Sequence, residues 1–291
     1  MSVIDTETIT VTATIPVGSK PRGVAVSPDG SKVYVTNVGT GNVSVISTAT
    51  DTVTATIPVG SAPIGVAVTP NGSKVYVTNQ GSANVSVIST ARNRVIATIP
   101  VGSEPYGVAV TPNGNTVYVA DGRSDDVSVI DTATDRVTAT IELGIHPQGV
   151  AISPDGSKVY VANVGEYNGG LYLPNVRVIS TLSNTVTATI QVGPDSLSQP
   201  TGVAVSPDGS KVYVTNVGTG NVPMISTATN TVTVTIPVGR TPRGVAVSPD
   251  GSKVYVTNDA DDNVSVIDTT TITVTAPIPV GSGYSLGSFI Q

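Results

Sequence analysis

The 291-residue sequence contains no cysteine and no tryptophan, and it has a single phenylalanine and a single histidine. The lack of cysteine excludes disulfide bonds and thiolate metal sites. Charged residues make up only 12% of the chain, with 14 basic against 20 acidic side chains. Nucleic-acid binding needs clustered basic residues that neutralise phosphates, so we predict no nucleic-acid partner.

Long apolar runs and a secretion signal are missing as well. No apolar run approaches the roughly 18 residues of a membrane-spanning helix, so we predict no membrane insertion. No charged leader with an apolar stretch and a small-residue cleavage site precedes Ser2, where strand-like sequence begins. We therefore expect either a cytoplasmic protein or one that has lost its leader.

Valine, threonine, glycine, serine and proline dominate instead, and they form an internal repeat. The phrase Pro-x-Gly-Val-Ala-Val-Ser-Pro-Asp-Gly or a close variant begins at six prolines: Pro21, Pro63, Pro105, Pro147, Pro200 and Pro242. The steps are 42, 42, 42, 53 and 42 residues, so one repeat carries an 11-residue insertion. β-Branched valine and threonine favour strands, and a repeat of this length is typical of radially stacked sheets.

Each repeat is expected to form four strands, which we name A to D in chain order. In the first copy they cover residues 23–27, 32–37, 42–46 and 52–59. Asp29-Gly30 is a tight-turn signal between A and B. Strand D carries a proline at one fixed position, which suits only an unpaired edge, so D should be the outer strand of each blade.

Counting the strands predicts an all-β, seven-bladed β-propeller that spans residues 1–291 as a single domain. Residues 2–6 match strand C, residues 10–17 match strand D, and six complete sets follow. Residues 284–290 can supply an A strand, so both termini are expected to build the closing blade. Because no segment matches strand B there, we expect a three-stranded blade, or an N-terminus that lacks one native strand.

The repeated Val-Tyr-Val-Thr-Asn at residues 33–37, 75–79, 212–216 and 254–258 resembles the YVTN family of β-propeller repeats. The flanking Val-Ser-Val-Ile-Asp-Thr and Ala-Thr-Ile-Pro-Val-Gly match that family too, and the nearest resemblance is to the propeller domain of archaeal surface-layer proteins. This resemblance implies an extracytoplasmic or cell-surface protein with a structural or adhesive role. Related propellers include streptogramin lyases, lactonases and quinoprotein dehydrogenase subunits, so fold alone does not settle activity.

Positions that differ between the copies are the candidates for function. The D–A and B–C loops share one rim of the ring, which we call the top. The residue inside each Pro-x-Gly should surround the channel mouth on this rim: Arg22, Ile64, Tyr106, Gln148, Thr201 and Arg243. The insertions, at 166–174 and 194–198, should also lie on the top and add Tyr167 and Tyr172 to a wall over the channel. The alternative is that they are tolerated surface excursions.

We predict a ligand-binding set of Arg22, Tyr106, Gln148, Tyr167, Tyr172 and Arg243. The arginines are suited to a carboxylate or sulfate, unless acids such as Asp259 simply balance them. His146 is the only candidate for a general base, and no catalytic motif surrounds it. The acidic loops 121–126 and 259–262 do not have the spacing of a calcium loop, so we predict no metal and no cofactor.

Three functional hypotheses follow. The first is a non-catalytic interaction or cell-surface scaffold propeller that binds a protein partner or a glycan on its top face. The second is an enzyme, a lyase or a lactonase-like hydrolase, with its site at the top mouth of the channel. The third is an accessory subunit of a redox enzyme. A deep pocket that joins His146 and Arg243 would favour the second, and a shallow channel would favour the first.

Overall fold

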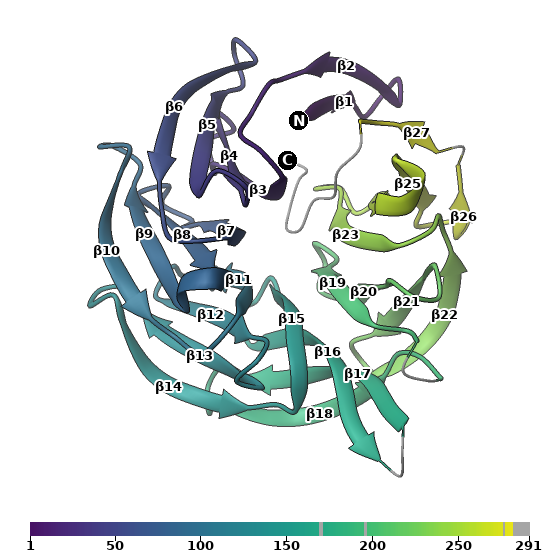
Figure 1. The fold of residues 1–291 in the computed structure, drawn as a ribbon. Helices are drawn as coiled ribbons and strands as arrows, with labels where there is room; N and C mark the ends of the chain where they lie inside the picture. Colours follow the sequence, from purple (N-terminus) through teal and green to yellow (C-terminus); the bar gives the residue numbers. More distant parts are fainter. Residues whose placement is uncertain (169–170, 195–196, 276, 282–291) are drawn as a thin grey trace.

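The computed structural model describes residues 1–168, 171–194, 197–275 and 277–281. These residues form a ring of antiparallel sheets around a central axis, with the described ends of the chain meeting on one side of the ring (Figure 1). Five blades are four-stranded sheets, the sixth has its outer strand divided into two short pieces, and a seventh is present in part, which is consistent with the predicted seven-bladed propeller. The repeat therefore tiles around an axis, as its period indicates.

Each blade runs from an inner strand to an outer strand in chain order. Blade one comprises β3 (Pro21–Val26), β4 (Lys32–Asn37), β5 (Asn42–Ser47) and β6 (Thr52–Pro58). Blade two comprises β7 (Pro63–Val68), β8 (Lys74–Asn79), β9 (Asn84–Ser89) and β10 (Arg94–Pro100). Blade three comprises β11 (Pro105–Val110), β12 (Thr116–Asp121), β13 (Asp126–Asp131) and β14 (Arg136–Glu142). Blade four comprises β15 (Ile145–Ile152), β16 (Lys158–Asn168), β17 (Leu171–Ser180) and β18 (Thr185–Gln191).

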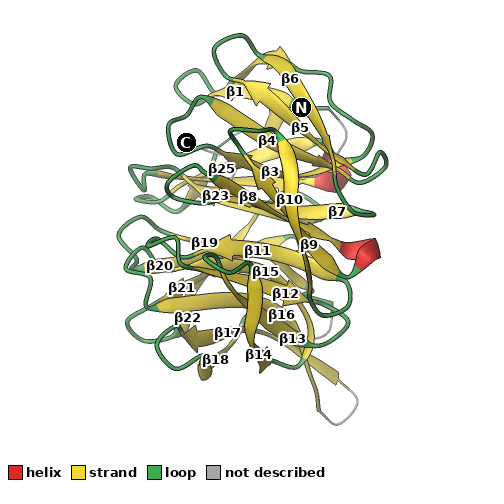
Figure 2. Cartoon of the chain, turned by 90° about the vertical axis from the view of Figure 1, so that its left-hand side faces the viewer, coloured by secondary structure: helices red, strands yellow, loops and turns green. Residues whose placement is uncertain are grey.

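Blade five comprises β19 (Pro200–Val205), β20 (Lys211–Asn216), β21 (Asn221–Ser226) and β22 (Thr231–Pro237). Blade six comprises β23 (Pro242–Val247), β24 (Lys253–Asn258), β25 (Asn263–Asp268) and two short outer strands, β26 (Thr273–Val274) and β27 (Ile278–Pro279), which both pair with β25. Two short 3-10 helices, η1 (Gln80–Ser82) and η2 (Asp259–Asp261), lie in B–C loops on the same rim (Figure 2). No helix among the described residues is long and apolar enough to cross a membrane.

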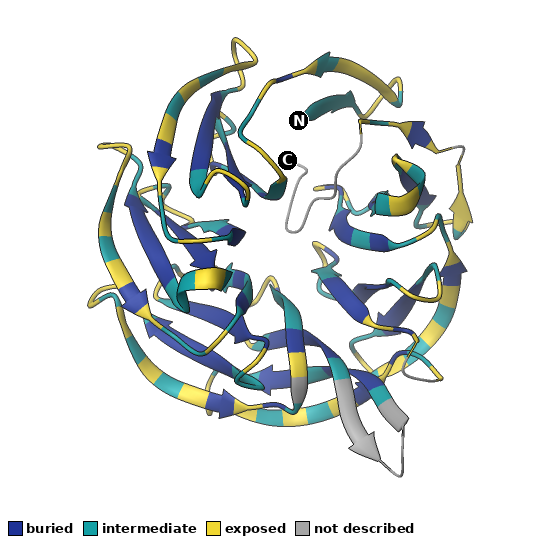
Figure 3. Cartoon of the chain, in the orientation of Figure 1, coloured by how far each residue is buried: buried dark blue, intermediate teal, exposed yellow. Residues whose placement is uncertain are grey.

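The outer position of strand D is confirmed by the sheet order β3-β4-β5-β6 in blade one. Strand β6 alternates between exposed and half-buried residues, whereas β4 and β5 are almost continuously buried (Figure 3). This pattern follows from position, because the two middle strands have a neighbouring blade on each face. Pro58 ends the outer strand, where the missing N–H has no further strand to pair with.

The core consists of layers between successive blades. One cluster joins Tyr34, Val43 and Val45 of blade one to Val66 and Val77 of blade two. Tyr34 and its counterparts in the next four blades are almost completely buried. The tyrosines are therefore framework residues, as their repetition predicts.

The innermost strands approach one another closely at the channel. A Cβ atom on Gly23 would collide with the backbone carbonyl oxygen of Ile64 in the next blade, and Gly65 faces Tyr106 in the same way. The glycine of each Pro-x-Gly is thus required by the contact between blades. The residue before it consequently occupies a fixed position on the channel rim.

Blade seven contains β1 (Ser2–Asp5) and β2 (Thr10–Thr14). Ile4 and Ile9 pack against Tyr255 of blade six, and Val3 packs beside Ile15 against Val35 of blade one. The N-terminal hairpin thereby closes the ring between the first and last complete blades. The expected third strand, at residues 284–290, lies outside the described residues.

The larger insertion is a strand extension and does not form a wall over the channel. β16 and β17 continue their ladder through Glu166↔Leu173, Tyr167↔Tyr172 and Asn168↔Leu171, and this hairpin points outward from the ring (Figure 1). The physical reason is that a continued ladder pairs the backbone groups of the added residues, which a loose loop would leave to water. The predicted placement of this segment above the channel was wrong.

Candidate functional site

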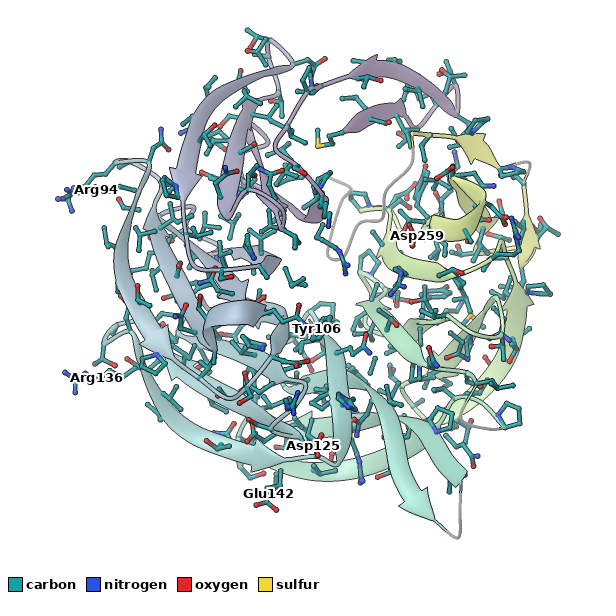
Figure 4. All side chains as sticks on the ribbon, viewed as in Figure 1. Arg94, Tyr106, Asp125, Arg136, Glu142 and Asp259 are labelled. Carbon is teal, nitrogen blue, oxygen red and sulfur yellow. The ribbon has the colours of Figure 1, made fainter. Side chains whose placement is uncertain are left out.

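The site begins with the six residues at the starts of the inner strands. Tyr106 begins β11 and Gln148 lies near the start of β15, and both are half-buried. They line a small cavity of ≈ 50 Å³ in the channel, whose wall is otherwise formed by glycine and valine residues of five inner strands and by Thr201. Figure 4 shows Tyr106 next to the central opening. Within the described part of the chain, this cavity is therefore small, and Tyr106, Gln148 and Thr201 supply its polar side chains.

Two arginines from blades one and six converge on this rim. Burial is the main cause that lowers the pKa of Arg22 to about 10, and the charge of Arg243 lowers it further. The charges of Tyr106 and Asp259 raise the pKa of Arg22 and so oppose part of this shift. Arg243 and Asp259 form an ion pair with Nε and Oδ2 3.4 Å apart. We call Arg22, Tyr106, Gln148, Arg243 and Asp259 the channel-mouth site.

Two further basic side chains, Arg240 and Lys20, lie on loops of the same rim. Arg240 donates from Nε to Oδ1 of Asp261 over 2.6 Å and from its guanidinium to the carbonyl oxygen of Ala260. Lys20 is exposed on the loop before Pro21. The ion pair with Asp261 therefore accounts for Arg240, whereas Asp259 pairs with Arg243 and also acts on the charge of Arg22.

His146 does not line the channel cavity within the described part of the chain. It is exposed, has a left-handed φ of 53°, and its backbone N–H donates to Oδ1 of Asp125 over 2.9 Å. The residue before the repeated proline is left-handed in every other blade as well: Lys20, Ala62, Glu104, Gln199 and Thr241. The conformation of His146 thus belongs to the framework, and its side chain faces solvent.

Tyr167 and Tyr172 are paired across the outward-pointing hairpin by their backbones. Their side chains lie outside the described part of the structure. The structure therefore brings Arg22, Tyr106, Gln148 and Arg243 to one rim, and it leaves the hairpin backbone directed away from them (Figure 1).

A pair of carboxyl groups in blade three was missed by the sequence analysis. In blades one, two, five and six, an asparagine pair ends the hairpin, as where Asn37 Nδ2 donates to Asn42 Oδ1 over 2.8 Å. Asp121 and Asp126 replace this pair in blade three. Burial raises the pKa of Asp121 to about 7, although a hydrogen bond from Ser128 opposes this shift. Burial and the neighbouring charge of Asp126 therefore favour the protonated form of Asp121.

The replacement was visible in the sequence, because Val-Tyr-Val-Ala-Asp departs from Val-Tyr-Val-Thr-Asn at residues 117–121. In the third and fourth repeats, alanine stands in place of the threonine of this phrase, at Ala120 and Ala162. In the described part of the chain, no group of three or more acidic, histidine or cysteine side chains is arranged to hold a metal ion.

Comparison with known proteins supports the fold. A family profile described as "Lactonase, 7-bladed beta-propeller" matches residues 156–275. No curated protein matches the chain in sequence. Among solved structures, Kuenenia stuttgartiensis hydrazine synthase is similar at 25% identity, with a TM-score of 0.81 over 94% of this chain and 90% of that chain.

Two further structures show the fold alone. A functionally unknown protein from Desulfotomaculum acetoxidans has 20% identity and a TM-score of 0.79, covering 97% of this chain and 93% of that chain. Virginiamycin B lyase from Staphylococcus aureus has 15% identity and a TM-score of 0.75, covering 90% and 85%. The chain is thus similar to β-propellers that include enzymes, and its similarity to the lactonase propellers covers residues 156–275.

Proposed function

We propose that the protein is a non-catalytic propeller that binds an acidic group of a glycan or protein partner at the channel-mouth site. The observation that carries this proposal is the convergence of Arg22 and Arg243, from blades on either side of the closing blade, at one rim. The charge of Arg243 disfavours the charged form of Arg22, and a bound anion between the two guanidinium groups would relieve that repulsion. A uronate, a sulfate or an acidic side chain supplies such an anion, and Tyr106 adds an aromatic surface.

The shape of the channel also supports binding without catalysis. The cavity beside Tyr106 and Gln148 has a volume of only ≈ 50 Å³, and His146 is exposed outside its wall. Within the described part of the chain, neither His146 nor Arg243 lines this cavity, whereas we expect an enzyme site to join them. The repeats of the YVTN type and their likeness to archaeal surface-layer propellers support a cell-surface setting for this binding role.

The test is calorimetric titration with chondroitin sulfate fragments, with neutral dextran as the comparison ligand. Arg22→Gln and Arg243→Gln should each weaken binding by about tenfold, the effect of losing one charge-assisted contact. Lys20→Gln is the matched control, because it removes an exposed positive charge from the same rim. Equal loss in all three variants would show nonspecific attraction, and unchanged binding in both arginine variants would contradict the proposal.

A second candidate is a lactonase-like hydrolase or a lyase, which the lactonase profile over residues 156–275 favours. In that case, the substrate carboxylate would bind Arg22 and Arg243 beside the lactone to be opened, and His146 would be the only imidazole base. Hydrolysis of aldaric acid monolactones, which keep a free carboxylate beside the lactone, followed by base uptake at constant pH, distinguishes the candidates. A rate that falls in His146→Ala supports the hydrolase, and no rate above buffer supports binding alone.

A role as an accessory subunit of a redox enzyme is a third candidate. Its support is the likeness to a chain from hydrazine synthase over 90% of that chain. Such a subunit would present the channel-mouth site or its outer strands to a partner chain. Light scattering of the purified protein with and without a candidate partner enzyme tests this role separately from glycan binding.

A further inference from the structure

The outer edge of blade three differs from most other outer edges at one position. β14 is the last strand of its sheet, so one of its edges has no neighbouring strand within the described part of the chain. Glu142 pairs with Asp126 of β13. In four other blades the residue in the corresponding pair is a proline: Pro58, Pro100, Pro237 and Pro279. Blade four has Gln191 there, so blades three and four lack the proline of these four blades.

This proline lies where an outer strand turns its N–H away from its own sheet. In blade three, the N–H of Leu143 donates to the carbonyl oxygen of Asp125 over 3.0 Å, so it faces β13. Because backbone groups alternate along a strand, the N–H and C=O groups of Glu142 and Thr140 face the free edge. A proline at an edge removes a donor that an added strand would use, and so protects the sheet from pairing with another chain. β14 keeps this donor.

β14 also carries opposite charges at its two ends. Arg136 begins the strand and Glu142 ends it, and both are exposed on the outside of the ring (Figure 4). In the described part of the chain, neither side chain forms an ion pair. Burial is the main cause that raises the pKa of Asp126, and the charges of Asp125 and Glu142 add to it, so like charges crowd the acidic end. An arginine from outside the chain would relieve this repulsion.

Antiparallel pairing of two copies of β14 brings the opposite charges together. The Arg136 end of each strand then lies beside the Glu142 end of the other, and opposite charges on adjacent strands stabilise the pairing. A symmetric interface makes this contact twice, because both chains use the same residues. β18 begins with Thr185 and ends with Gln191, so pairing of two β18 strands gains no ion pair. The charge pattern therefore favours β14, and a second copy of this chain as its partner.

We propose that the protein forms a symmetric dimer in which β14 of one copy pairs antiparallel with β14 of a second copy. The two four-stranded sheets of blade three thereby form one continuous sheet. Because β14 runs from the bottom rim to the top rim, antiparallel pairing turns the second copy over. The two channel mouths of the dimer then face in opposite directions. The dimer does not depend on what the channel-mouth site binds.

Sedimentation velocity of the whole chain over a range of concentrations tests this proposal, and we expect a monomer–dimer equilibrium. Arg136→Glu and Glu142→Arg should each weaken dimerisation by about tenfold or more, because a repulsive pair replaces an attractive one at both ends of the interface. An equimolar mixture of the two variants should dimerise again, since each supplies the charge that the other needs. A chain with both substitutions should dimerise as well, because its charges are exchanged and still complementary.

Glu142→Pro tests the backbone contribution and should abolish the dimer, while the fold accepts a proline at this position, as Pro58 shows in blade one. Gln191→Pro is the matched control, because it places the same residue at the same position of β18 and leaves β14 intact. It should not change dimerisation. The proposal is overturned if the parent protein remains monomeric at about 1 mM. It is also overturned if the mixed charge variants stay monomeric, or if Gln191→Pro abolishes the dimer as Glu142→Pro does.

Discussion

The hydroxyl of Thr36 in blade one donates to the backbone carbonyl oxygen of Ile64 in blade two over 2.7 Å. The same hydroxyl accepts a hydrogen bond from the backbone N–H of Gly23, also over 2.7 Å. Thr78 and Thr215 repeat this bridge toward Tyr106 and Arg243. The bridge connects neighbouring inner strands and fixes the residues that surround the channel mouth.

We predict that Thr36→Val destabilises the protein by about 1–3 kcal/mol, because a buried N–H and a buried C=O lose their partner while the side-chain volume is kept. The free energy of unfolding in urea measures this effect. Thr56→Val, on the exposed outer strand β6, is the control and should change stability little. Equal stability of Thr36→Val and the parent protein would show that the bridge does not hold the blades together.

Restoring the missing threonine is expected to stabilise blade three. Ala120 stands where the bridging threonine lies in blades one, two, five and six, so Ala120→Thr should add the hydroxyl between Gly107 and Gln148 and stabilise by about 1 kcal/mol. Ala120→Val adds similar volume without the hydroxyl. A higher melting temperature for the valine variant than for the threonine variant would contradict this explanation.

The carboxyl pair of blade three predicts an unusual pH dependence. The pKa of Asp121 is raised from its ordinary 3.8 to about 7, mainly by burial, so the folded protein binds an additional proton between these values. The contribution of Asp121 to the free energy of unfolding should therefore be greatest at low pH. It should fall as the pH rises from about 4 to about 7, and then level off. Burial also raises the pKa of Asp126, and the nearby charges of Asp125 and Glu142 add to this shift.

Asp121→Asn should remove this dependence, because an asparagine amide can donate to Asp126 at any pH, as Asn37 donates to Asn42 in blade one. We expect the variant to be more stable than the parent by about 1–4 kcal/mol at pH 8 and nearly equal to it at pH 4. Urea unfolding at several pH values measures the difference. Asp51→Asn, at an exposed turn, is the control. A constant difference in stability across the pH range would rule out a raised pKa of Asp121 as its cause.

A strained isoleucine faces another buried tyrosine. Ile9 has a left-handed φ of 57°, which is costly for a β-branched residue, and it packs near Tyr255, whose hydroxyl has no partner among the described residues. Asn184 occupies the equivalent turn position in blade four and accepts from Tyr118 over 2.8 Å. Ile9→Asn should therefore raise stability by about 1 kcal/mol despite the loss of apolar area.

The melting temperature tests this prediction when it is combined with Tyr255→Phe. If the gain comes from the new hydrogen bond as well as from backbone relief, it should shrink in the Tyr255→Phe background. A loss of stability in Ile9→Asn would show that packing of Ile9 outweighs its backbone strain.

The repeat made the blades, their strand order and the channel-rim positions predictable. Asp29-Gly30 defined a turn, and the proline of strand D, such as Pro58, identified the outer edge. The extra residues around Tyr167 were not placed correctly, because an insertion that extends a ladder has the same polar, glycine-containing composition as a loop. The Asp121–Asp126 pair was read as loop charge, since its burial depends on a neighbouring blade that the local sequence does not contain.

The convergence of Arg22 and Arg243 at the channel mouth is tested most directly by soaking crystals of the protein in selenate and measuring anomalous scattering. The binding role predicts a selenium peak between these two guanidinium groups, and loss of that peak in Arg22→Gln. A map with no peak at the channel mouth, or with selenate only beside Lys20 and Arg240, would contradict it.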